Sequence, residues 1–201
     1  MSSIYNNQEA LVLDSAYLLA NSNTIKFTTL KFYITNIRLY KNEKIVWQEK
    51  YSFHLYDDSE EARQSFQIDV PAKIQYTHIA FNLGIDSLTN VSGAMGGDLD
   101  PTKGMYWTWQ SGYINFKLEG TSSLITNPKK EFQFHLGGYM HPFNTLQNVY
   151  LKIKQPGKIN VLFDVKRFLE AIELTSQHHI MSPNTDAVKL SEATSKCFSV
   201  Q

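Results

Sequence analysis

The sequence has one cysteine, no excess of charge of either sign and no long apolar run. A single cysteine, Cys197, excludes an intrachain disulfide framework, and we expect it to be an inert buried thiol. The 19 basic and 19 acidic residues balance, so no long-range field attracts nucleic acid or anionic lipid. No run approaches the roughly 20 consecutive apolar residues of a membrane span. We therefore expect neither a nucleic-acid partner nor a membrane span.

Familiar catalytic motifs are also absent. The sequence has no Gly-x-Ser-x-Gly elbow, no phosphate-cradling loop and no paired catalytic carboxylates, so we expect a protein that is not an enzyme. The first seven residues lack a basic stretch followed by an apolar one. This leaves open a cytoplasmic protein or an exported one whose signal peptide has been removed.

Short apolar runs of strand length recur along the chain, and turn-forming residues separate several of them. An aromatic content of 13% and many Thr, Ile and Val residues favour β structure. The pattern predicts an all-β fold, an antiparallel two-sheet β-sandwich, formed by a single domain over residues 1–201. The expected strands cover residues 25–27, 30–40, 45–47, 51–56, 65–70, 77–84, 106–118, 131–136, 149–153 and 158–164.

One or two short helices are expected near the C-terminus. Residues 165–174 place apolar side chains on one helical face, and Asp164 just before them is a good N-cap. Residues 186–196 form a second candidate. Residues 41–43 are expected to form a hairpin turn between two apolar strands.

Two of the three tryptophans, Trp107 and Trp109, lie two residues apart in an extended, aromatic-rich run. Side chains at i and i+2 of a strand project from the same face, so Met105 and the two indoles are expected to form one row. So much aromatic surface indicates either a core or a binding site, and the residues alone favour neither.

His135 is the histidine best placed for a site. It lies in the run Phe132–Gly138, where a strand reaches two glycines, and its side chain is expected to face away from Phe132 and Phe134. Loops at the end of a sandwich are the usual place for sites on such scaffolds.

Further soft donors follow along the chain. Met140 and His141 come just after the glycine turn, and His178, His179 and Met181 lie in a later loop. Imidazole and thioether groups suit copper, above all Cu(I). The alternative is that the two methionines only fill gaps in the core.

Two stretches resemble the MbnP-like copper-binding domain family. Residues 104–117 read Gly-Met-Tyr-Trp-Thr-Trp-Gln-Ser-Gly-Tyr-Ile-Asn-Phe-Lys, and residues 132–138 read Phe-Gln-Phe-His-Leu-Gly-Gly. The resemblance spans residues 10–165. It implies a periplasmic or extracellular β-sandwich in which copper is bound by histidines together with a tryptophan that a partner dihaem enzyme has oxidised to kynurenine.

Carried over to this chain, the resemblance makes His135 the family's Phe-His-Leu-Gly histidine and makes either Trp107 or Trp109 the kynurenine precursor. One departure is visible, because Val91 follows Asn90 where the family's copper-binding branch has a second histidine. A complete site then needs His141, His178 or His179. The expected function is copper binding or copper handling, and the alternative is a structural or ligand-binding β-sandwich that has lost the metal site.

Overall fold

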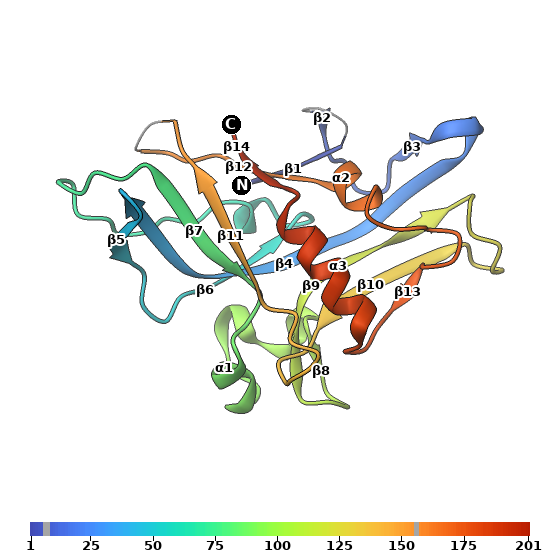
Figure 1. The fold of residues 1–201 in the computed structure, drawn as a ribbon. Helices are drawn as coiled ribbons and strands as arrows, with labels where there is room; N and C mark the ends of the chain where they lie inside the picture. The colour runs from blue at the N-terminus through green and yellow to red at the C-terminus, as the bar shows by residue number, and fades with distance from the viewer. Residues whose placement is uncertain (6–8, 155–156) are drawn as a thin grey trace.

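The computed structural model describes residues 1–5, 9–154 and 157–201. Strands make up 40% of the chain and helices 17%, and the sheets form a sandwich-like fold, which confirms the expected fold class. Figure 1 shows the smaller sheet lying above the larger one, with both ends of the chain at the smaller sheet.

The larger sheet is built around β4 (Thr24–Lys41), the long strand that crosses the middle of Figure 1. Buried Leu30, Phe32 and Ile34 alternate along it with outward-facing residues. The sheet runs in the order β11 (Gln147–Lys152), β7 (His78–Leu83), β4, β9 (Gly112–Ser122), β10 (Glu131–Gly137) and β13 (His179–Ile180); β3 (Ala16–Leu18), β5 (Lys44–Gln48) and β6 (Phe53–Asp57) also pair with β4, and β8 (Tyr106–Trp107) pairs with β9.

The smaller sheet joins strands from the two ends of the chain. Its order is β14 (Phe198–Val200), β12 (Val161–Asp164), β1 (Ser2–Tyr5) and β2 (Glu9–Ala10). β1 runs parallel to β12, and β13 runs parallel to β10, so the sandwich is not purely antiparallel as the sequence predicted. Parallel neighbours need long connections, and these two pairs join strands that are distant in the sequence.

The main hydrophobic core fills the space between the larger sheet and a second layer formed by the smaller sheet, α2 (Val165–Leu169) and α3 (Thr185–Ser195). Phenylalanine dominates it, and the rings contact one another within and between the sheets at centroid distances of 5.0 to 6.1 Å, in the range of favourable aromatic pairs. The fully buried rings include Phe27, Phe32, Phe81, Phe116, Phe132, Phe134, Phe163 and Phe168.

The other face of the larger sheet carries a second, smaller apolar cluster. It contains Tyr33, Leu99, Met105, Trp107 and Tyr113. The segment between β7 and β9 covers this cluster and lies below the sheet in Figure 1. Its short elements are α1 (Ser87–Val91), β8 and the 3-10 turns η3 (Gly97–Leu99) and η4 (Pro101–Lys103); the turns η1 (Ala20–Ser22) and η2 (Glu61–Arg63) lie elsewhere in the chain.

The helix predicted over residues 165–174 is shorter than expected, because α2 ends at Leu169. Asp164 does cap it, accepting hydrogen bonds from the backbone of Lys166 and Arg167. A helix this short has little stability of its own, so tertiary packing decides where it ends. The second prediction is confirmed by α3, which Asn184 caps.

Local turn chemistry explains one confirmed prediction, and missing partners explain one error. Asn42 and Glu43 both have positive φ, at 49° and 64°, and connect β4 to β5 as the expected hairpin turn.

Residues 65–70 were predicted to form a strand, but they form none. Their apolar side chains do alternate, and Ile68 and Val70 pack against the core, but no strand of the described chain pairs with them.

Candidate functional site

The two tryptophans lie in a tight hairpin rather than in one continuous strand. β8 ends at Trp107, which pairs with Gly112, so the strand predicted over residues 106–118 is interrupted by the turn at residues 108–111. Ser111 has a φ of 53°, which reverses the chain there. The indoles of Trp107 and Trp109 remain in contact, with ring centroids 5.6 Å apart, but Trp107 is 6% exposed and Trp109 is 65% exposed. They form a pair with one buried and one exposed ring.

Trp107 packs over the end of β10. A Cβ atom added to Gly137 would lie 2.6 Å from Cζ3 of the Trp107 ring and 2.7 Å from the carbonyl oxygen of Tyr113. Only glycine lets the indole approach the backbone this closely. The buried Nε1 of Trp107 has no hydrogen-bond partner among the described residues. Gly137 is two residues beyond His135, so the indole and the imidazole lie over neighbouring positions of one strand face.

His135 faces away from the main core, as the alternation of β10 predicts. Phe132 and Phe134 belong to the main core, whereas the Nε2 atom of His135 lies 2.7 Å from Oε1 of Glu119 on β9. The histidine is 6% exposed. Thr29 on β4 donates a second hydrogen bond to Glu119 at 2.9 Å, and the ammonium of Lys117 lies 3.6 Å from the same carboxylate.

These contacts hold Glu119 in its charged form. The hydrogen bond from His135 is the main reason why the pKa of Glu119 falls from 4.5 to about 2. Burial opposes this effect by disfavouring the charge, and Lys117 and Thr29 add to the lowering. The sequence alone offered one signal for Glu119, because Lys117 and Glu119 alternate with the apolar Phe116 and Leu118.

The same sheet face continues the row of charges onto β4 and β6. Lys31 forms an ion pair with Asp57 at 2.7 Å, and Asp57 is 2% exposed. Burial alone would raise the pKa of Asp57, but hydrogen bonds from Lys31 and Ser59 outweigh it and hold this pKa below its usual value. We call Lys31, Asp57, Lys117, Glu119 and His135 the polar row.

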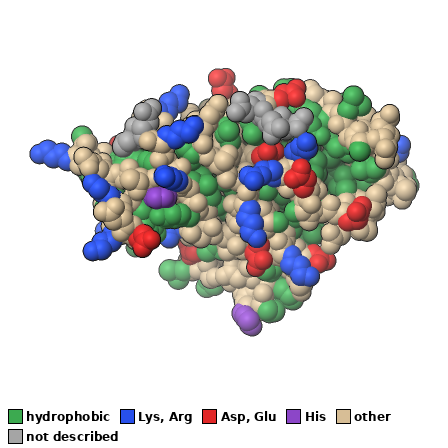
Figure 2. Space-filling view, turned by 45° about the horizontal axis from the view of Figure 1, so that its top comes forward, with side chains coloured by type: hydrophobic (Ala, Val, Ile, Leu, Met, Phe, Trp, Pro, Cys, Tyr) green, Lys and Arg blue, Asp and Glu red, His purple; other side chains and the backbone are tan. Residues whose placement is uncertain are grey.

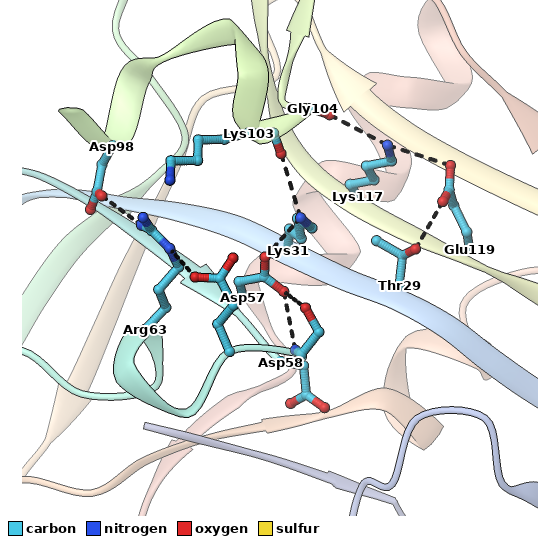
Figure 3. Close-up of polar contacts among 12 residues, drawn as sticks. Thr29, Lys31, Asp57, Asp58, Arg63, Asp98, Lys103, Gly104, Lys117 and Glu119 are labelled. Carbon is cyan, nitrogen blue, oxygen red and sulfur yellow. Dashed lines mark hydrogen bonds and ion pairs between the residues drawn. The ribbon is translucent and has the colours of Figure 1, made fainter. Parts of the chain in front are cut away.

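The polar row also holds the covering segment in place. Figure 3 shows Lys31 and Lys117 reaching the backbone of the loop that precedes β8, where they donate to the carbonyl oxygens of Lys103 and Gly104, each at 3.4 Å. Asp98 from the same segment pairs with Arg63 at 2.6 Å. The tryptophan hairpin therefore follows a segment that is fastened to the sheet by charged side chains.

The other predicted histidines lie at two different places along β10. His141 is exposed in the loop that follows the two glycines. His179 is exposed on β13 and pairs with Gln133, and the carbonyl oxygen of His178 accepts a hydrogen bond from the backbone of Gln133. Nδ1 of His178 is buried and has no hydrogen-bond partner among the described residues.

Met181 is the soft donor that follows β13 directly. In the parallel pair of β10 and β13, Phe134 lies opposite Ile180, which is the last residue of β13. Within residues 1–5, 9–154 and 157–201, no three His, Cys, Asp or Glu side chains gather closely enough to hold a metal ion. Any site here must rely on few ligands or include a donor of another type.

The fold and this site together define a β-sandwich whose aromatic hairpin covers one end of a charged sheet face. The sequence model of the MbnP family matches residues 2–184, and the chain belongs to that family. The solved structure of MbnP from Methylosinus trichosporium is similar, with a TM-score of 0.55 at 14% identity, covering 93% of this chain and 85% of that one. At this identity the likeness supports the fold alone. The search of curated proteins returned no match.

Membership places the chain in an extracytoplasmic family that is associated with methanobactin and copper. No helix in the described part of the chain is both long and apolar enough to cross a membrane. Figure 2 shows mainly basic side chains at the left end of one face and basic and acidic side chains interspersed over the rest of that face.

Proposed function

We propose that this protein is a periplasmic or extracellular copper-handling protein, not an enzyme, that binds copper through His135. The observation that carries the proposal is the hydrogen bond between His135 and Glu119. Histidines that ligate metals usually donate their second ring N–H to a carboxylate, which fixes the ring and raises its basicity. Here the contact uses Nε2, and Nδ1 makes no hydrogen bond within the described residues, so Nδ1 is the atom left for a metal.

The donors near His135 fit monovalent copper better than zinc. A structural zinc site needs four nitrogen, sulfur or oxygen ligands in a tetrahedron, and the described residues offer no cluster of that kind. His135 on β10 and Met181, which follows β13 directly, offer one imidazole and one thioether, a combination that soft Cu(I) accepts. His179 in β13 lies two residues before Met181 and is a further candidate imidazole.

The tryptophan pair supplies the second part of the proposal. Trp107 lies over Gly137, two residues from His135, so kynurenine formed there would bring an arylamine and a ketone close to the histidine. Trp109 is the more accessible ring at 65% exposed. Either residue remains a precursor, and a dihaem enzyme is the proposed oxidising partner. Peptide mass spectrometry after co-expression with that enzyme identifies the modified residue, and two unmodified tryptophans would contradict this part.

A titration with Cu(I) against a competing chelator tests the copper site. We expect one tightly held ion in the wild type, at least tenfold weaker binding in His135→Gln, and no change in His78→Ala, a control on β7. The glutamine keeps a polar partner for Glu119, and near-ultraviolet circular dichroism checks that the variant is folded. Equal affinity in the wild type and His135→Gln would overturn the assignment.

The second candidate is a β-sandwich that keeps the family fold without the metal site. It is favoured by the absence of a three-ligand cluster among the described residues and by the burial of Met105 and Trp107 in a core cluster. Under this alternative Trp107 serves stability alone, and its indole buries on the order of 200 Å². A wild-type protein that fails to compete with the chelator for Cu(I) would favour this alternative.

A further inference from the structure

A large cavity opens between the two layers of the sandwich, where β4 and β7 face β12. In the larger sheet these two strands lie on the side away from β13. The cavity volume is about 1050 Å³. Strand residues form its inner wall, namely Ile37 and Leu39 of β4, Ile79 and Phe81 of β7, and Val161 of β12. Each of these side chains is at most 7% exposed, so the wall is apolar and shielded from bulk water.

Close packing does not produce a space of this size by accident. Protein interiors are packed as densely as organic crystals, and few voids exceed one water molecule. An unfilled apolar cavity destabilises the fold in proportion to its volume. Ligand pockets, in contrast, commonly measure about 300–1000 Å³ and are lined mainly by apolar side chains. The volume and lining of this cavity are therefore those of a binding pocket.

The backbone around the cavity departs from regular sheet in two places. A β-bulge at Asn36 and Ile37 places two residues of β4 opposite one of β7, and Asn36 has a φ of 51°. Bulges bend the strand that carries them and are common beside binding sites. Residues 65–72 line the cavity without forming a strand among the described residues.

Residues 66–75, most of which line the cavity, have side-chain contacts at both ends. Phe66 stacks on His54 with ring centroids 3.9 Å apart, and Gln75 accepts a hydrogen bond from Lys41 at 2.7 Å. Between these two anchors, Asp69 and Lys73 form no ion pair with the described residues. Ile68 and Val70 pack against the core between these two anchors, so the segment closes one side of the cavity.

We infer that the cavity binds a medium-chain or long-chain fatty acid. The hydrocarbon chain lies against the apolar wall formed by β4, β7 and β12. Lys158, which lines the cavity from the segment before β12 and forms no ion pair within the described chain, takes the carboxylate at the rim. The hydrophobic effect supplies the affinity. Among the described lining residues Lys158 is the one cationic side chain and Asp69 the one anionic side chain, so the carboxylate of the ligand lies at Lys158 and away from Asp69.

Isothermal titration of the delipidated protein with dodecanoate, below its micelle concentration, tests the inference. We expect one site in the wild type. Ile37→Trp fills the cavity from the inner wall and should weaken binding at least tenfold. Val46→Trp, a matched control on the half-exposed outer hairpin strand β5, should leave the affinity unchanged. Ile79→Phe is the second cavity-filling variant if Ile37→Trp loses its near-ultraviolet circular dichroism.

Two further arms test the head group. Lys158→Gln should weaken dodecanoate several-fold and leave dodecanol unaffected. Absence of dodecanoate binding, or equal binding by the wild type and a folded cavity-filled variant, would overturn the site. Equal affinity for dodecanoate and dodecanol, unchanged by Lys158→Gln, would overturn the acid as its ligand. His135→Gln should bind dodecanoate normally, so this result and that of the copper titration are independent.

Discussion

Replacing Glu119 by glutamine tests whether the polar row stabilises the fold through charge. The pKa of Glu119 falls from 4.5 to about 2, and each tenfold change in proton affinity is worth about 1.4 kcal/mol. The network therefore favours the charged carboxylate by at most about 3 kcal/mol. The side chain is 22% exposed, and a neutral glutamine still accepts hydrogen bonds, so we expect Glu119→Gln to lose about 1–2 kcal/mol at pH 7.

The pH dependence gives the sharper test. A carboxyl group with a lowered folded-state pKa contributes stability that is fully present above its unfolded pKa. For Glu119 that contribution is lost as the pH falls from about 4.5 towards about 2, because the protonated side chain then resembles glutamine. We therefore expect the difference in unfolding free energy between the wild type and Glu119→Gln to shrink over this range.

Urea denaturation of metal-free protein at several pH values measures this difference. Glu131→Gln is the matched control on the neighbouring strand, since Glu131 is half-exposed and its only ion-pair partner among the described residues is Lys129 at 3.9 Å. The control should change stability by less than about 0.5 kcal/mol at any pH. A loss in Glu119→Gln that stays constant between pH 7 and pH 3 would refute the electrostatic reasoning.

Two further predictions concern the backbone. Gly137→Ala should destabilise the protein by about 1–3 kcal/mol, because the new methyl group collides with the Trp107 ring and with the backbone. Urea denaturation measures the loss, and stability equal to the wild type would contradict the close contact. Glu43→Gly should stabilise it by about 0.5–1 kcal/mol, since glycine adopts the positive φ of this turn without strain; a lower melting temperature would contradict the assigned hairpin geometry.

Much of the fold could be predicted because its signals are local. Alternating apolar residues indicated most of the strands, and Asp164 marked the start of α2 through its own side chain. The errors arose where pairing partners decide the outcome. Residues 65–70 alternate like a strand but find no partner among the described residues, and the run from Tyr106 contains a hairpin that only its pairing with β9 reveals.

The site was harder to predict because its contacts join distant parts of the sequence. The outward direction of His135 followed from Phe132 and Phe134, which is a local argument. Its partner Glu119 lies 16 residues away on β9, and residues 178–180 come to β10 only because β13 adds in parallel to that strand. Spacing along the chain carries no information about such a parallel pairing.

The alternation of the larger sheet separates the two proposed binding regions. His135 lies on the outward face with Trp107 and the polar row, whereas Phe134, its neighbour along the chain, lies in the main core. The cavity opens on that inner side of the sheet, where Ile37 and Phe81 line it. A copper ion beside His135 and a fatty acid beside Ile37 would therefore contact opposite faces of one sheet. A change on one face can reach the other only through the shared strands, and packed strands resist small displacements.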